Sequence, residues 1–156
     1  MQPSILGTRL VHWRDEAACA ASAASLAGHP ALADAFVELH GPLGAGKTTF
    51  ARHLLHALGV PGRIKSPTYA VMEPYEPPGL PVWHFDFYRF EDPQEWEDAG
   101  FRDVFASRGL KLAEWPEKAA GLVPEPDLSI RIEPRDDEQR SVTMDAHTSR
   151  GMELLK

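Results

Sequence analysis

The sequence predicts an α/β fold in one domain, with a mixed parallel and antiparallel sheet flanked by helices. Short apolar runs of strand pattern lie between segments of helical pattern, which is typical of this class. The chain has 156 residues, the usual length of one domain. Several predicted strands are joined by links too short for a crossover helix, so those neighbours must be antiparallel. We expect one domain over residues 1–156, with a core from about residue 9 to residue 148 and a C-terminal tail at 149–156.

Strands are predicted where short apolar runs lie between turn residues. They fall at residues 9–13, 35–40, 68–75, 81–89, 110–115, 128–133 and 142–147. The Pro-Pro-Gly turn at 77–79 joins the third and fourth strands as a hairpin. The polar segment 135–140 joins the last two in the same way.

Helices are predicted at residues 15–28, 47–58 and 91–98. Asp15 is a suitable N-cap for the first helix, and Gly28 ends it. Residues 60–67 contain two prolines and a glycine and therefore form a loop after the second helix. The third helix is acidic, which fits either a solvated helix face or a docking surface for a basic partner.

Composition excludes several classes of protein. The formal net charge of −7 argues against a protein that binds nucleic acid by electrostatics alone. The single cysteine, Cys19, allows neither a disulfide framework nor a cysteine metal cluster, and we interpret it as a small buried residue rather than a nucleophile. No apolar run is long enough to span a membrane, and acidic residues precede the alanine-rich run at 17–27, unlike in a secretory signal. We expect a cytoplasmic protein that does not bind a membrane.

One motif carries most of the functional information. Residues 41–48, Gly-Pro-Leu-Gly-Ala-Gly-Lys-Thr, fit the pattern G-x-x-x-x-G-K-S/T between a predicted strand and a predicted helix. The glycines let backbone N–H groups point inward at a phosphate, while Lys47 reaches the terminal phosphates and the Thr48 hydroxyl reaches Mg²⁺. The motif predicts a P-loop NTPase-like domain that binds a nucleoside triphosphate. We expect the nucleotide to contact Gly41, Leu43, Gly44, Ala45, Gly46, Lys47, Thr48 and Thr49.

Carboxylates at the ends of two predicted strands are the candidate catalytic groups. Alternation along residues 82–89 places the tryptophan and the two phenylalanines at 83, 85 and 87 on one face and His84, Asp86 and Tyr88 on the other. Such a polar row suits the lining of a site, and the alternative is a solvent-facing edge strand. Asp86 and Glu114 both end apolar runs, so either can be the acid that holds Mg²⁺ directly or through water. The alternative for Glu114 is an exposed carboxylate at a strand end.

The loop after the motif helix contains a candidate sensor. Thr68 occupies the place where GTPase-like folds carry a switch threonine that meets Mg²⁺ and the γ-phosphate, although a turn threonine fits the spacing equally well. The chain contains no asparagine, so the Asn-Lys-x-Asp motif that reads guanine is absent. We therefore expect the nucleotide to be ATP or ADP.

Four ordered segments together resemble one family. Residues 41–49, 65–69 (Lys-Ser-Pro-Thr-Tyr), 84–89 (His-Phe-Asp-Phe-Tyr-Arg) and 114–116 (Glu-Trp-Pro) closely resemble the motifs of the TsaE family. These proteins are bacterial P-loop ATPases of tRNA threonylcarbamoyladenosine modification. The resemblance runs from about Trp13 to Glu133.

The resemblance implies a function. It implies an ATPase that works with TsaD and TsaB homologues, hydrolyses ATP to reset their complex between turnovers, and meets tRNA indirectly through that complex. It also implies that Thr48 and Glu114 form the Mg²⁺ site, that hydrolysis needs Asp86, and that Trp115 is a functional neighbour of the nucleotide.

Two other functions stay open. A small-molecule P-loop kinase needs a lid whose arginines neutralise the transferred phosphoryl group. After Glu114, the arginines Arg131, Arg135 and Arg140 fall instead on predicted strands or their hairpin. A nucleotide-dependent binding module without catalytic activity is the third possibility.

Overall fold

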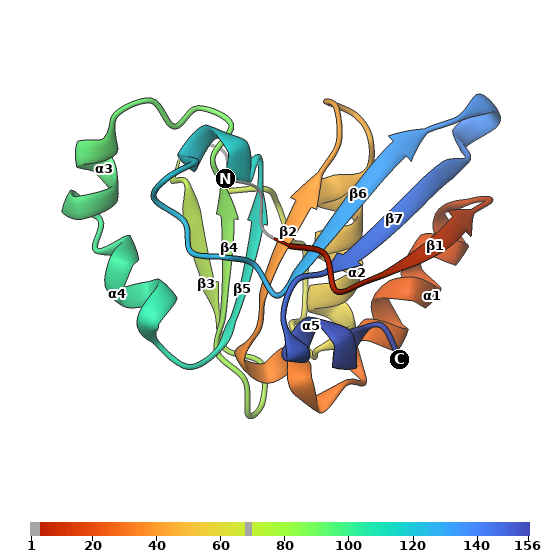
Figure 1. The fold of residues 1–156 in the computed structure, drawn as a ribbon, viewed down its shortest axis with the longest axis horizontal. Coiled ribbons are helices and arrows are strands. Elements are labelled where there is room, and N and C mark those ends of the chain that lie inside the picture. Colours follow the sequence, from red (N-terminus) through yellow and green to blue (C-terminus); the bar gives the residue numbers. More distant parts are fainter. Residues whose placement is uncertain (1–3, 68–69) are drawn as a thin grey trace.

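The computed structural model describes residues 4–67 and 70–156 and contains a seven-stranded sheet (Figure 1). Across the sheet the strands follow the order β1 (Gly7–Trp13), β7 (Arg140–Ala146), β6 (Leu128–Pro134), β2 (Phe36–His40), β5 (Leu110–Glu114), β4 (Val82–Asp86) and β3 (Met72–Tyr75). The central pairs β6–β2, β2–β5 and β5–β4 are parallel, and the outer pairs are antiparallel. The predicted mixed α/β sheet is therefore confirmed.

Helices pack against both faces of the sheet (Figure 1). The α-helices are α1 (Glu16–Ala27), α2 (Lys47–Ala57), α3 (Pro93–Asp98), α4 (Phe101–Ala106) and α5 (Ser149–Leu154), and short 3-10 turns form η1 (Pro30–Asp34), η2 (Pro116–Ala119) and η3 (Asp136–Glu138). Asp15 caps α1 by accepting from the backbone N–H of Ala18 at 2.9 Å, and Gly28 ends the helix, as the sequence predicts. No helix in the described part of the chain combines the length and apolar character needed to cross a bilayer.

The central strands are buried on both faces. Successive residues of β2 enter different apolar clusters: Val37 packs in the cluster beneath α1 and α2, and Phe36 in an aromatic cluster beside α3 and α4. The same alternation holds in β4, where Val82 belongs to the first cluster and Phe85 to the second. Residues of β4 and β5 with even numbers therefore face α2, and this face is the one that carries the candidate site.

Four segments differ from the sequence-based expectation, and one of them is residues 101–106, which form α4 although no helix is predicted there. Residues 149–154 form α5 rather than a tail: the Thr148 hydroxyl caps the helix, and Leu154 is buried. The strand expected over 81–89 ends at Asp86, because Phe87 to Phe90 form a turn closed by a 3.0 Å backbone hydrogen bond. The strand expected over 68–75 is observed from Met72, and residues 68–69 lie outside the described part.

Candidate functional site

The glycine loop, residues 41–46, joins β2 to α2 and has the backbone of a phosphate cradle. Gly41, Gly44 and Gly46 have φ values of 147°, 82° and 111°, a region that other residues rarely adopt. A Cβ on Gly41 would also lie 2.4 Å from the carbonyl oxygen of Ile132 on β6. The loop can therefore keep this shape against the sheet only with glycine at position 41.

Lys47, the first residue of α2, lies at the mouth of the loop. Its Nζ donates to the carbonyl oxygen of Gly41 at 2.6 Å and lies 3.2 Å from the centroid of the Trp115 ring. Burial lowers the pKa of Lys47, and the nearby carboxylates of Glu114, Glu117 and Asp86 act in the opposite direction. Trp115 has a left-handed backbone (φ 56°) directly after β5, and this turn leaves its ring against Lys47.

The Glu114 carboxylate makes two side-chain hydrogen bonds, one to α2 and one to β4. The Thr48 hydroxyl donates to its Oε1 at 2.7 Å, and Nε2 of His84 lies 2.7 Å from its Oε2. Glu114 is only 2% exposed, so the alternative of an exposed strand-end carboxylate is wrong. The two oxygens of one carboxylate thus face different neighbours, one from the helix and one from β4.

Asp86 lies directly opposite Glu114 in the parallel pairing of β4 with β5. Its Oδ2 accepts from the Ser66 hydroxyl at 2.6 Å and its Oδ1 from the backbone N–H of Tyr88 at 3.0 Å. The first contact ties the carboxylate to the loop that follows α2. Asp86 is 5% exposed, and its proximity acts to raise the pKa of Lys47.

The predicted polar row on β4 is observed, but it is not solvent-facing. His84 and Asp86 are buried under α2 and the loops, and only Tyr88, beyond the end of the strand, is substantially exposed. The alternative of an edge strand is wrong, since β4 lies between β5 and β3. The Tyr88 ring lies 5.0 Å from that of Trp115, so both aromatics border the same opening.

A cavity of about 420 Å³ brings most of the predicted residues together. Its lining includes Leu43, Gly44, Ala45, Gly46, Lys47, Thr48, Thr49, Asp86, Glu114 and Trp115. Gly41 does not line the cavity and instead provides the carbonyl that holds Lys47. Thr68, the predicted sensor, lies outside the described residues; Ser66, which the sequence analysis did not select, contacts Asp86.

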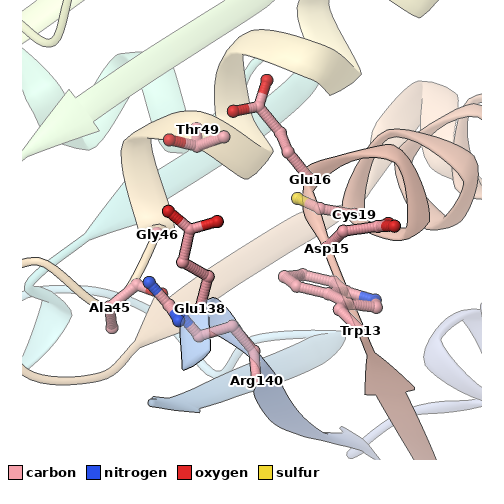
Figure 2. Close-up of a pocket in the computed structure, with 9 residues that line it drawn as sticks. All are labelled: Trp13, Asp15, Glu16, Cys19, Ala45, Gly46, Thr49, Glu138 and Arg140. Atoms are coloured by element: carbon pink, nitrogen blue, oxygen red, sulfur yellow. The ribbon is translucent and has the colours of Figure 1, made fainter. Parts of the chain in front are cut away.

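A second cavity, of about 180 Å³, adjoins the first (Figure 2). Figure 2 shows Trp13 and Cys19 on one side and Arg140 with Glu138 on the other, next to Gly46 of the glycine loop. Arg140 also lines the first cavity and donates from Nε to the carbonyl oxygen of Ala45 at 2.7 Å. This cavity could not be predicted from the sequence, because β1, α1, η3 and β7 approach the glycine loop only in the folded chain.

Cys19 contributes an apolar wall rather than a nucleophile. Burial, together with the charge of Glu16, raises the pKa of its thiol to about 12, and Arg140 offsets this only in part. The thiol is therefore protonated at neutral pH, in agreement with the interpretation from sequence.

The donor set fits a Mg²⁺ that shares its ligands with phosphate. Thr48 and Glu114 offer hard oxygen atoms at the end of the glycine loop, the kind of ligand that Mg²⁺ prefers. Among the residues that the structure describes, no group of three or more His, Cys, Asp or Glu side chains forms a metal site. A cation at this place would therefore take its remaining ligands from water or from a bound phosphate, as Mg²⁺ does in nucleotide sites.

Comparison with known proteins identifies the family. The model of the family described as "Threonylcarbamoyl adenosine biosynthesis protein TsaE" matches residues 13–142. The chain is 43% identical over 119 residues to the Haemophilus influenzae "tRNA threonylcarbamoyladenosine biosynthesis protein TsaE", which covers 76% of this chain and 75% of that one. It is 38% identical over 110 residues to the Bacillus subtilis protein of the same name, which covers 70% of this chain and 68% of that one. The crystal structure of Bacillus subtilis YdiB aligns with a TM-score of 0.79 at 27% identity, over 97% of this chain and 94% of that one. This chain belongs to the TsaE family.

Proposed function

We propose that this protein is a Mg²⁺-dependent ATPase that takes part in the threonylcarbamoyladenosine modification of tRNA. The hydrogen bond between Thr48 and Glu114 at the mouth of the glycine loop carries this proposal, because it joins the two Mg²⁺ ligands expected from the sequence. The names of the relatives support the biosynthetic role.

Each residue has a defined task in the proposed reaction. The glycine loop binds the phosphates through backbone N–H groups, and Lys47 transfers its hydrogen bond from the Gly41 carbonyl to the β/γ-phosphates. Thr48 and Glu114 hold Mg²⁺, which when bound neutralises charge on the phosphates during transfer. Asp86 orients the attacking water and accepts its proton while the bond between the γ-phosphorus and ADP breaks.

We place the nucleoside toward the second cavity. That cavity shares Thr49 and Arg140 with the phosphate cavity, so a nucleotide can extend from one into the other. Trp13 offers an aromatic wall and Cys19 an uncharged one. The absence of asparagine from the chain removes the guanine-reading motif, so we expect ATP and ADP to bind more tightly than GTP and GDP.

The proposed partners are homologues of TsaD and TsaB, with tRNA reached indirectly through their complex. The loop that carries Ser66 gives a physical route for nucleotide-dependent partner binding, because Ser66 bonds Asp86 beside the phosphate cavity. A partner that contacts this loop would sense the state of the site through one hydrogen bond.

A small-molecule kinase is the alternative function. Kinases of this class close an arginine-bearing lid over the phosphates. Here Arg131 lies on β6, and Arg135 donates to the Ser141 hydroxyl across the β6–β7 hairpin. Arg140 reaches the glycine loop from β7, a sheet strand rather than a mobile lid. These placements favour hydrolysis over transfer to a second substrate.

Steady-state ATP turnover, measured alone and with a TsaB–TsaD pair, tests the proposal. We expect weak turnover alone and faster turnover with the pair, and Lys47→Ala should abolish both, since its contact to phosphate contributes about 1.5–3 kcal/mol. Lys156→Ala, at the far C-terminus, is the matched control and should behave as wild type. Normal hydrolysis by Lys47→Ala would refute the site.

A tRNA modification assay over many turnovers tests the biosynthetic role. Without this protein the TsaB–TsaD pair should stop after about one round, and wild type but not Lys47→Ala should restore it. Sustained modification without this protein would refute the resetting role. Transfer of labelled γ-phosphate to a small acceptor without partners would support the kinase instead.

A further inference from the structure

We propose that His84 is a positioning residue that fixes the orientation of Glu114, so that one oxygen of this carboxylate faces the Mg²⁺ position beside Thr48. This inference rests on the proposed function, because it assigns how the metal ligand is held. It concerns a residue that touches neither the phosphates nor the metal.

The geometry of the carboxylate carries the proposal. His84 binds Oε2 of Glu114 through Nε2 at 2.7 Å, while Thr48 binds Oε1 at 2.7 Å. Both partners in the His84–Glu114 contact are almost fully buried, with side chains 1% and 3% exposed. Two anchors on different oxygens stop the carboxylate from rotating about its last bond. Groups that orient a metal ligand in this way raise metal affinity without touching the metal.

The register of the sheet makes the contact specific. In the parallel pairing of β4 with β5, His84 lies opposite Leu112 and Asp86 opposite Glu114. The imidazole therefore reaches diagonally, two residues along the neighbouring strand, on the face that carries α2. Asp86, which lies directly opposite Glu114, instead bonds Ser66 and the Tyr88 backbone.

The other ring nitrogen shows that the fold alone does not require histidine here. A carboxylate only accepts hydrogen bonds, so Nε2 of His84 is the donor in this contact. Within the described residues, Nδ1 of His84 is the buried side-chain nitrogen or oxygen without a hydrogen-bond partner. An unsatisfied buried polar atom is destabilising, whereas an apolar side chain at this fully buried position would avoid that cost. The histidine is accounted for by what Nε2 does for Glu114.

Two amide substitutions separate donation from packing. His84→Gln places an amide N–H near the position of Nε2, and His84→Asn carries the same amide one methylene shorter, so that it cannot reach Glu114. The readout is ADP binding by calorimetry over a series of Mg²⁺ concentrations and in EDTA, which needs no turnover. We expect metal-free ADP affinity within about twofold of wild type for both variants. His84→Asn should require at least about tenfold more Mg²⁺ for half-maximal enhancement, and His84→Gln should stay within about threefold of wild type.

The possible outcomes are distinct. An unchanged Mg²⁺ requirement in His84→Asn, or an equal rise in both variants, would overturn the positioning role. If wild type itself binds ADP without any Mg²⁺ enhancement, the metal site of the proposed function fails before His84 is tested.

A measurement on wild type tests the contact directly. Imidazole ¹⁵N signals, assigned to His84 by their loss in His84→Gln, should show a proton on Nε2, and these signals should shift when Mg²⁺ and ADP are added together but not with ADP in EDTA. An Nε2 without a proton, or no response to Mg²⁺, would contradict the proposal.

Discussion

Replacing Gly41 by alanine tests the structural reason for the first glycine of the motif. The change costs about 1–2 kcal/mol for a left-handed backbone (φ 147°). The new Cβ would also lie 2.4 Å from the carbonyl oxygen of Ile132, and relieving such overpacking costs a further 1–3 kcal/mol, roughly. The loop or β6 must move, and β6 is fixed by its pairing with β2 and β7. We expect a loss of about 2–5 kcal/mol in the free energy of unfolding.

Gly44→Ala is the matched control. Gly44 also has positive φ, 82°, but a Cβ there meets nothing within 4 Å, so only the backbone cost of about 1–2 kcal/mol applies. Urea unfolding without nucleotide, followed by tryptophan fluorescence, measures both variants independently of activity. Equal losses for the two variants would refute the contact between the glycine loop and β6.

Three further outcomes test individual groups. Asp86→Asn should change stability by less than about 1 kcal/mol, since the amide can still bond Ser66, but should lower ATP turnover at least about 100-fold, as measured with partners present. Cys19 should react with iodoacetamide far more slowly in the native than in the urea-unfolded protein between pH 9 and 11, because its thiol ionises near pH 12 only in the folded state; equal rates would contradict this. ADP should change the tryptophan emission of wild type, in part because Lys47 leaves the Trp115 ring, and Trp115→Phe should lose that part of the change yet bind ADP within about fivefold of wild type.

The contiguous parts of the site could be predicted from sequence. The glycine loop is predicted from the eight consecutive residues of its motif, because its backbone conformation depends on local glycines. Asp86 and Glu114 were found because a carboxylate that ends an apolar run marks a strand end. Parallel strands bring their carboxyl ends to one edge of the sheet, and here the two residues lie opposite each other.

Contacts that depend on strand order could not be predicted in this way. The bond from His84 to Glu114 requires β4 to lie beside β5 in one particular register, and no local pattern fixes that register. The second cavity requires β1 and β7 to pair and Arg140 to reach Ala45, across 95 positions of sequence. Helices α4 and α5 have only six residues each, too few for a clear helical period.

The two carboxylates at the strand ends differ in what holds them, and this difference supports separate roles. Glu114 is bonded to the first turn of α2 and to β4, which are both regular elements packed in the core. Asp86 is bonded to Ser66, in the loop that follows α2, and to the backbone beyond its own strand. A rearrangement of that loop would break or move the hydrogen bond of Asp86 to Ser66. It would leave the hydrogen bonds of Glu114 in place, because the two carboxylates share none of these hydrogen bonds. The proposed metal binding and the proposed hydrolysis could therefore be separated in this fold: rigid elements would hold the cation, and a partner that moved the loop would set the rate at which water is activated.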